Sequence, residues 1–178
     1  MSIPVIFLDR DGVINKEVNY LSRIEDFVFI DGAIDSIKYL LGIGYEIIVI
    51  TNQSGIARGL YTLEDYHVIN SWMLNEFKRA DINILDVFFC PHGPEDDCNC
   101  RKPKPGMILD ARKKYDIDLS NSWLVGDKED DIACAISAGI RNTVLVKSGH
   151  PISIESSNAK YIKESLAEVK EVIKTNLN

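Results

Sequence analysis

Two carboxylates stand one residue apart behind an apolar run near the start of the chain. The stretch IFLDRDGVIN, residues 6–15, places Asp9 and Asp11 directly after three apolar residues that are typical of a buried strand. Burying charge is costly unless an opposite charge or a metal compensates it. The pattern therefore predicts a cation opposite Asp9 and Asp11.

Polar side chains also follow three later apolar runs. EIIVI is followed by Thr51, Asn52, Gln53 and Ser54, LDVFF is followed further on by Arg101 and Lys102, and WLVG is followed by Asp127 and Lys128. Sites in parallel sheets lie beyond the carboxyl ends of the strands, so we expect all of these side chains at one edge.

This set of residues suits phosphoryl transfer. Asp9, Asp11 and Asp127 would repel one another without a cation, and a few hard oxygen ligands suit Mg²⁺. Thr51, Asn52 and Lys102 supply donors for a phosphoryl group, and a carboxylate can attack phosphorus. Asp11 lies where it could protonate a leaving oxygen and then deprotonate the attacking water.

Strand and helix patterns alternate along the whole chain. The predicted strands are Pro4–Leu8, Glu46–Ile50, Leu85–Phe89, Ser122–Val125, Thr143–Val146 and Ala159–Ile162. The predicted helices are Ala33–Leu41, Thr62–Lys78, Met107–Tyr115, Glu129–Ala138 and Ser165–Lys174. This alternation predicts an α/β fold with a doubly wound, mainly parallel sheet, and a single domain over residues 1–178.

Composition narrows the classes of protein and of partner. The chain has 178 residues, 46% of them hydrophobic, and a net charge of −7, which argues against binding to nucleic acid. We find neither a signal peptide nor an apolar run of the ~20 residues that cross a membrane. We therefore expect a cytoplasmic monomer that acts on a small molecule, in a compartment where disulfides are rare.

Three cysteines and a histidine form a cluster in residues 90–100. The spacing C-x-H-x₅-C-x-C places Cys90, His92, Cys98 and Cys100 in a loop without an apolar anchor. Three thiolates and an imidazole make a complete tetrahedral ligand set for Zn²⁺. We therefore predict a structural zinc that stabilises this loop in place of a hydrophobic core. Unrelated loop thiols are the alternative. Cys134 lies apart among apolar neighbours and is predicted to be a core residue.

The segments FLDRDG, TNQ, CRKP and VGDKEDD, in this order and each after a predicted strand, resemble the four motifs of the haloacid dehalogenase (HAD) superfamily. The resemblance implies that Asp9 is the nucleophile and Asp11 the general acid and base. It implies that Asp9, Asp127 and the main-chain carbonyl of Asp11 hold Mg²⁺, supported from behind by Asp131. It further implies that Thr51 and Lys102 hold the phosphoryl group. Members with a large cap insert it between these motifs, and the short gaps here indicate a capless, Rossmann-like member.

With the zinc loop included, the chain resembles the D-glycero-D-manno-heptose 1,7-bisphosphate 7-phosphatases, a family of sugar bisphosphate phosphatases. That resemblance implies Mg²⁺ and Zn²⁺ as cofactors and a role in making nucleotide-activated heptose for surface polysaccharides, including lipopolysaccharide. The implied substrate-binding residues are Glu17, Val18, Asn19, Tyr20, Thr51, Asn52, Gln53, Ser54, Arg101, Lys102 and Lys128.

Two other functions share part of this pattern. Histidinol-phosphate phosphatase domains resemble the chain in DRDG, TNQ and the zinc loop, but SGIARG after TNQ favours the sugar enzyme. A phosphoacceptor receiver domain, which signals, also uses Asp, Thr and Lys at strand ends. The zinc loop and the DRDG spacing argue against it, and turnover of a small phosphate ester would exclude it.

Overall fold

Six parallel strands carry the polar segments predicted above to one edge of the molecule. Residues 2–173 are described by this computed structural model, and their strands are β1 Val5–Leu8, β2 Glu46–Asn52, β3 Asp86–Cys90, β4 Trp123–Gly126, β5 Asn142–Val146 and β6 Tyr161–Lys163. They form one sheet in the order β3-β2-β1-β4-β5-β6, with every neighbouring pair parallel. Strand order reverses between β1 and β4, which is where ligands bind in such sheets.

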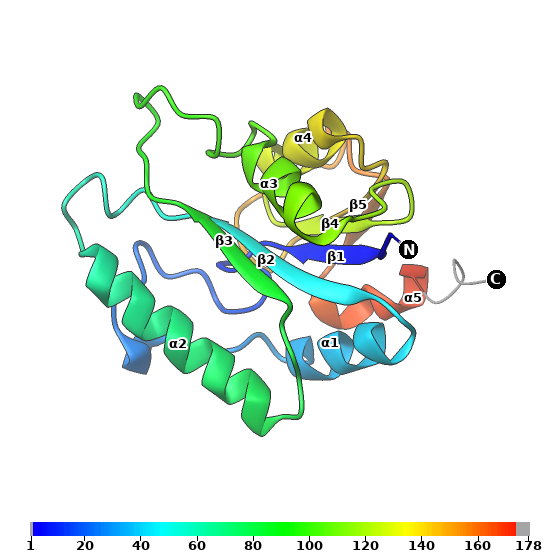
Figure 1. The fold of residues 1–178 in the computed structure, drawn as a ribbon, viewed down its shortest axis with the longest axis horizontal. Coiled ribbons are helices and arrows are strands. Elements are labelled where there is room, and N and C mark those ends of the chain that lie inside the picture. Colours follow the sequence, from blue (N-terminus) through cyan, green and yellow to red (C-terminus); the bar gives the residue numbers. More distant parts are fainter. Residues whose placement is uncertain (1, 174–178) are drawn as a thin grey trace.

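Helices cover both faces of this sheet, as the doubly wound prediction requires (Figure 1). They are α1 Ala33–Gly42, α2 Leu63–Arg79, α3 Gly106–Tyr115, α4 Glu129–Ala138 and α5 Lys170–Ile173. In Figure 1, α1, α2 and α5 lie below the strands, and α3 and α4 lie above them. Thr62 begins α2, where its side chain and that of Asp65 each accept a hydrogen bond from the other's main-chain N–H.

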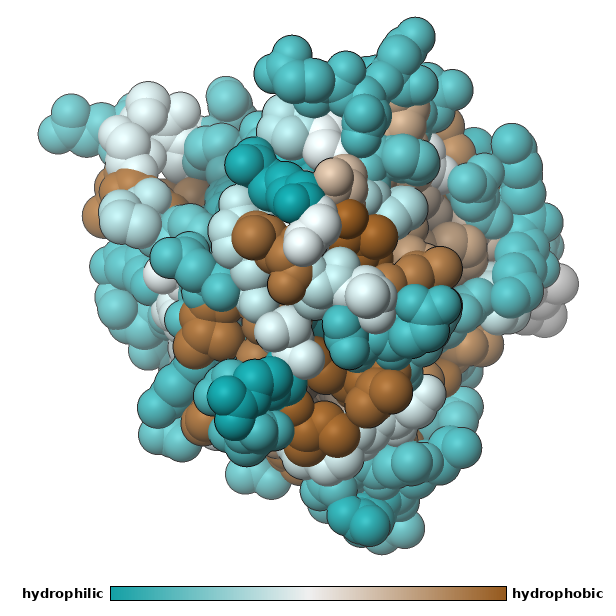
Figure 2. Space-filling model, turned by 90° about the vertical axis from the view of Figure 1, so that its left-hand side faces the viewer, coloured by the Kyte–Doolittle hydropathy of each residue, from teal (hydrophilic) through white to brown (hydrophobic). Residues whose placement is uncertain are grey.

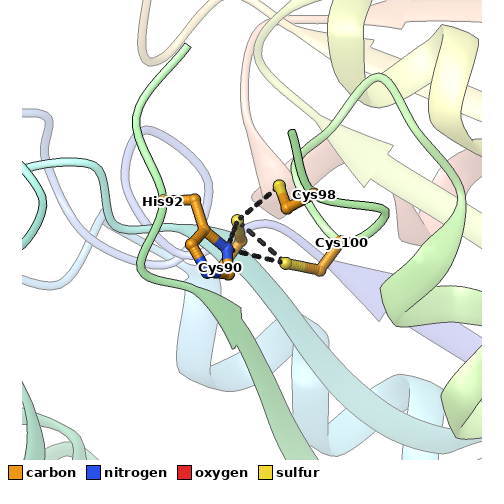
Figure 3. Close-up of side chains that lie close together, drawn as sticks. All are labelled: Cys90, His92, Cys98 and Cys100. Carbon is orange, nitrogen blue, oxygen red and sulfur yellow. Dashed lines mark hydrogen bonds between the residues drawn. The ribbon is translucent and has the colours of Figure 1, made fainter. Parts of the chain in front are cut away.

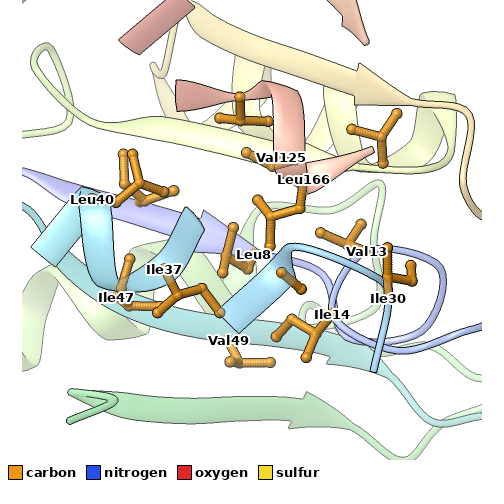
Figure 4. Packing of buried hydrophobic residues seen from close by; sticks show 14 of the residues in the cluster. Leu8, Val13, Ile14, Ile30, Ile37, Leu40, Ile47, Val49, Val125 and Leu166 are labelled. Carbon is orange, nitrogen blue, oxygen red and sulfur yellow. The ribbon is translucent and has the colours of Figure 1, made fainter. Parts of the chain in front are cut away.

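The core is divided by the sheet because successive side chains of a strand point to opposite faces. Ile6 and Leu8 of β1 pack with α1 and α2 in one cluster, and Val5 and Phe7 pack with α3 and α4 in the other. Figure 4 shows the first cluster, in which Leu8 lies among the side chains of β2 and α1. All four residues of β1 are fully buried, so the strand that ends at Asp9 is held on both faces.

Apart from bounds that differ by a single residue, four predictions about elements need correction. Thr51 and Asn52 belong to β2, because they pair with Phe89 and Cys90 of β3. The helical spacing of Leu63 with Tyr66 and Ile69 predicts that Leu63 is on the buried side of α2, but it occupies the first turn and is 40% exposed.

The other two corrections lie near the end of the chain. The last strand begins at Tyr161 and not at Ala159. The closing helix is divided into a 3₁₀ turn, Leu166–Glu168, and the short α5, and Lys174 lies outside the described residues. Among the described helices, none is both long enough and apolar enough to cross a membrane.

Candidate active site

Asp9 leaves β1 at the reversal point and turns sharply toward β4. Its main-chain N–H donates to the carbonyl of Val125 at 3.0 Å, which fixes the start of the turn. Gly12 follows with φ of 89°, and a Cβ on it would lie 2.3 Å from Asp127 Oδ2. Glycine is therefore required twice over, by the backbone angle and by the closeness of Asp127.

Lys102 lies buried between two carboxylates. Its Nζ is 2.9 Å from Asp9 Oδ1 and 2.6 Å from Asp131 Oδ1, and it also donates to the carbonyl of Ile50 at 3.0 Å. Burial works to lower the Lys102 pKa, but Asp131 and Asp9 outweigh burial and raise the pKa above its ordinary value. The amine therefore stays charged beside Asp9, where it can neutralise a phosphoryl oxygen.

One lysine does not compensate the three carboxylates gathered here. Oxygens of Asp9, Asp127 and Asp131 lie within 4.8 Å of one another. Burial raises the pKa of Asp9 well above its usual range, and burial with the charge of Asp131 raises that of Asp127 to about 6. Asp127 Oδ1 is buried and has no hydrogen-bond partner among the described residues. An uncompensated oxygen among buried carboxylates fits a divalent cation.

The carboxylate of Asp11 points into a different network. The buried guanidinium of Arg10 contacts both of its oxygens at 3.0–3.3 Å, and Asn15 and Gln53 donate to it from 3.0 and 3.1 Å. Burial would raise the Asp11 pKa, but Arg10 and these donors hold it below its ordinary value. Asp11 is therefore ionised, the state in which it can accept a proton.

Gln53 links this network to β2. Its Nε2 also donates to Thr51 Oγ1 at 2.8 Å, and its Oε1 accepts from the hydroxyl of Tyr61 at 2.6 Å. Asn52, predicted to bind substrate, lines the cavity described below, and both of its side-chain groups bond the main chain of Lys102, at 3.0 and 3.1 Å. In this structure Asn52 therefore holds Lys102 in place.

A cavity of about 280 Å³ opens at this edge of the sheet. Figure 2 views the molecule from this side, where hydrophilic and hydrophobic residues are intermixed on the surface. Twelve predicted residues line it: Asp9, Asp11, Glu17, Asn19, Tyr20, Asn52, Gln53, Ser54, Arg101, Lys102, Lys128 and Asp131. Val18, Thr51 and Asp127 were also predicted but are not among the residues that line it. Val18 is 37% exposed, and the other two are buried.

Five lining residues were not among the predicted site residues: Leu21, Arg58, Tyr61, Asp130 and His150. His150 is the most informative, because its Nδ1 lies 2.6 Å from Asp127 Oδ2. The signal that could have found it is its place after β5, since the same strand-end argument applies to a fifth strand.

The cysteine cluster is assembled as predicted, with side chains that point toward one another (Figure 3). Cys90 Sγ lies 3.1 Å from Cys100 Sγ, 3.8 Å from Cys98 Sγ and 3.5 Å from His92 Nδ1. Tetrahedral Zn²⁺ with ordinary bond lengths separates its ligand atoms by about 3.5–3.8 Å, which matches two of these distances, while the Cys90–Cys100 distance is shorter. Three thiols and an imidazole nitrogen gathered in this way suit a zinc site. Burial raises the pKa of the Cys90 thiol, so a thiolate there needs a neighbouring cation.

Comparisons with known proteins agree with this geometry. A family model described as HAD-hydrolase-like matches residues 99–169. The D-glycero-alpha-D-manno-heptose-1,7-bisphosphate 7-phosphatase of Photorhabdus laumondii is 53% identical over 164 residues, covering 88% of this chain and 90% of that protein. The D-glycero-beta-D-manno-heptose-1,7-bisphosphate 7-phosphatase of Escherichia coli K12 is 41% identical over 181 residues, covering 97% and 95%.

A solved structure supports the same conclusion. The D,D-heptose 1,7-bisphosphate phosphatase of B. bronchiseptica, crystallised with magnesium and phosphate, superposes with a TM-score of 0.86 at 31% identity and covers 97% of this chain and 99% of that one. The fold class and the resemblance drawn from the motifs are thereby confirmed. The chain belongs to the heptose 1,7-bisphosphate 7-phosphatase family of HAD-like hydrolases.

Proposed function

We propose that this protein removes the 7-phosphate of D-glycero-D-manno-heptose 1,7-bisphosphate through a phosphorylated Asp9. The observation that carries the proposal is the buried Asp9 carboxylate, held 2.9 Å from Lys102 in a cavity that is lined by further cations. Relatives that cover nearly the whole chain are named for this reaction. The product would serve the synthesis of nucleotide-activated heptose.

Asp9, Asp127 and the main-chain carbonyl of Asp11 would hold Mg²⁺. Support comes from the unpartnered Asp127 Oδ1, from the raised pKa values of Asp9 and Asp127, and from the magnesium in the B. bronchiseptica structure. The ion supplies positive charge that neutralises the phosphoryl oxygens during transfer. Asp131 supports the site indirectly, since its side chain bonds Lys102 and the main-chain N–H groups of Asp127 and Lys128.

The reaction would proceed in two steps, and side chains of the protein would carry out the bond and proton transfers in each. The Asp9 carboxylate attacks phosphorus, the bond from phosphorus to the 7-oxygen breaks, and Asp11, which must be protonated for this step, gives its proton to that oxygen. Water then attacks the acyl phosphate and gives its proton to Asp11, which releases phosphate and restores Asp9. Thr51 and Lys102 would hold the phosphoryl oxygens throughout. Arg10 favours ionised Asp11, which suits the second step and opposes the first.

The second phosphate of the substrate would meet other cations that line the cavity. Arg101 and Lys128 line the cavity, as predicted, and Arg58 adds a third positive charge. Charge-assisted hydrogen bonds are worth about 1.5–3 kcal/mol each, so two of them favour a bisphosphate over a monophosphate by roughly 10²-fold or more. Histidinol phosphate lacks the second anion and carries positive charge, so we expect it to be a poor substrate.

A structural zinc at Cys90, His92, Cys98 and Cys100 would shape the other wall of this cavity. Cys100 immediately precedes Arg101 and Lys102, and Arg101 Nη1 donates to the carbonyl of His92 at 3.3 Å. The loop that would hold zinc therefore also positions Arg101, one of the cations proposed to bind the second phosphate. Elemental analysis of protein purified without chelator should find one zinc per chain.

The substrate is tested by measuring kcat/KM side by side for the α and β anomers of the heptose bisphosphate, fructose 1,6-bisphosphate and histidinol phosphate. The heptose compounds should be the best substrates, and the higher identity to the relative named for the α anomer favours that anomer. If kcat/KM is highest for histidinol phosphate, the proposed heptose bisphosphate substrate is refuted. A single, stoichiometric phosphorylation of the protein without turnover would refute the proposal that it is an enzyme and would favour a phosphoacceptor receiver domain.

The nucleophile is tested by Asp9→Asn, which should abolish turnover because an amide does not attack phosphorus. Lys128→Met should raise KM for the bisphosphate, while Lys113→Met is the matched control, since Lys113 is exposed on α3. Turnover in Asp9→Asn at the parental rate would refute the mechanism. That the protein works as a cytoplasmic monomer stays a prediction, which light scattering can check for the oligomeric state.

A further inference from the structure

Three consecutive residues after β5 close over the turn that carries the catalytic aspartates. The Ser148 hydroxyl donates to the carbonyl of Gly12 at 2.7 Å, and Gly149 packs against both Gly12 and Asp127. A Cβ on Gly149 would lie 2.0 Å from Asp127 Oδ2, so no other residue fits there without a shift. The segment 148–150 is therefore shaped around the carboxylate of Asp127.

His150 binds one oxygen of that carboxylate twice. Its main-chain N–H donates to Asp127 Oδ2 at 3.1 Å, and its Nδ1 lies 2.6 Å from the same atom. The other oxygen, Oδ1, is buried without a partner among the described residues, and Asp127 itself is fully buried. The two oxygens thus have distinct environments, one saturated by donors and one left for a ligand.

We infer that His150 is a positioning residue, which orients Asp127 so that Oδ1 alone is presented to the divalent cation. The inference rests on the proposal that Asp127 holds Mg²⁺. Groups that hydrogen-bond a metal-binding carboxylate fix its orientation, and their loss typically weakens metal binding by about 10–100-fold. An imidazole that carries a proton on Nδ1 can donate this hydrogen bond.

His150 could instead be a metal ligand itself, because Glu17, Asp127 and His150 bring ligand atoms within 4.8 Å of one another. The distances favour the positioning role. Two atoms that bind the same small divalent ion lie about 3 Å or more apart, given bonds of about 2.1 Å, whereas Nδ1 and Oδ2 are 2.6 Å apart. Asp127 Oδ2 already accepts from the main chain as well, so it is the oxygen less suited to an ion.

The test measures Mn²⁺ affinity by electron paramagnetic resonance on the full chain with its zinc site filled and without substrate. His150→Leu should weaken Mn²⁺ binding about tenfold, at the low end of the range because the main-chain donor remains. His150→Asn should restore affinity to within about threefold of the parent, because the amide nitrogen of Asn can take the place of Nδ1. His67→Leu is the matched control and should change nothing, since His67 is exposed on α2.

The outcomes separate this inference from the metal site on which it rests. Unchanged Mn²⁺ affinity in Asp127→Asn would refute the metal site itself. With that site intact, His150→Leu within threefold of the parent would overturn the positioning role. Equal weakening in His150→Leu and His150→Asn, or a second Mn²⁺ that both variants lose, would also overturn it, because His150 would then act as a ligand. If His150→Leu does not fold, His150→Ala carries the same expectation.

Discussion

The buried pair of Arg10 and Asp11 gives the sharpest prediction, because removing one partner leaves the other charge without compensation. Arg10 is 1% exposed, and its Nε and Nη2 contact both oxygens of Asp11 at 3.0–3.3 Å. Its guanidinium also lies 5.9 Å from the centre of the Tyr66 ring. Arg10→Met keeps most of the side-chain volume and removes the charge.

We expect Arg10→Met to lower the free energy of unfolding by about 3–5 kcal/mol at pH 7, the range for breaking a buried ion pair. The lower half of that range is favoured, since the Asp11 side chain is 19% exposed and keeps the donors Asn15 and Gln53. Arg10→Met/Asp11→Asn should recover most of the loss, because the neutral amide does not require a cation. The double variant therefore distinguishes an uncompensated charge from a packing defect.

The assay is urea denaturation of the zinc-loaded protein, in which 3–4 kcal/mol corresponds to a midpoint lower by roughly 2 M. The Asp11 pKa is lowered in the folded protein, so its stabilising contribution is present above pH 3.8 and is lost as the pH falls through the folded pKa. The difference between parent and Arg10→Met should therefore narrow below about pH 4. A loss under 1 kcal/mol at pH 7, or a double variant no more stable than Arg10→Met, would refute the reasoning.

Three further changes probe the zinc loop and the walls of the cavity. Cys98→Ser should lose zinc and lower the thermal midpoint by roughly 4–8 °C, as a cost of about 2 kcal/mol implies; an unchanged midpoint in scanning calorimetry would count against a structural zinc. Tyr61→Phe should cost about 1–3 kcal/mol in urea denaturation, because it leaves the oxygen of Gln53 without its donor at 2.6 Å, and equal stability would contradict that hydrogen bond. Gly149→Ala should weaken Mn²⁺ binding in the resonance assay, because the new Cβ would displace Asp127. Unchanged affinity would mean that the segment 148–150 shifts and leaves the Asp127 carboxylate in place.

The sequence by itself determined the sheet, its buried strands and the edge at which the chemistry lies. Strand patterns and strand-end residues are local features, and parallel strands bring their carboxyl ends together whatever the loops do. Asp9 and Lys102, 93 positions apart, could therefore be paired before the fold was known. The zinc ligands could also be predicted from the sequence, because all four lie within eleven residues and their spacing is characteristic.

The tertiary structure alone decided how each polar side chain is used. Asn52 bonds the main chain of Lys102, Arg10 takes the carboxylate of Asp11, and His150 takes one oxygen of Asp127. Asn52 and Lys102 lie 50 positions apart and His150 and Asp127 lie 23 apart, so packing between distant segments selects these partners. Arg10 and Asp11 are neighbours in the chain, and the turn that follows β1 sets how their side chains meet. Residue type restricts the possible partners, but only the close approach of β1, β4 and the segment after β5 selects among them.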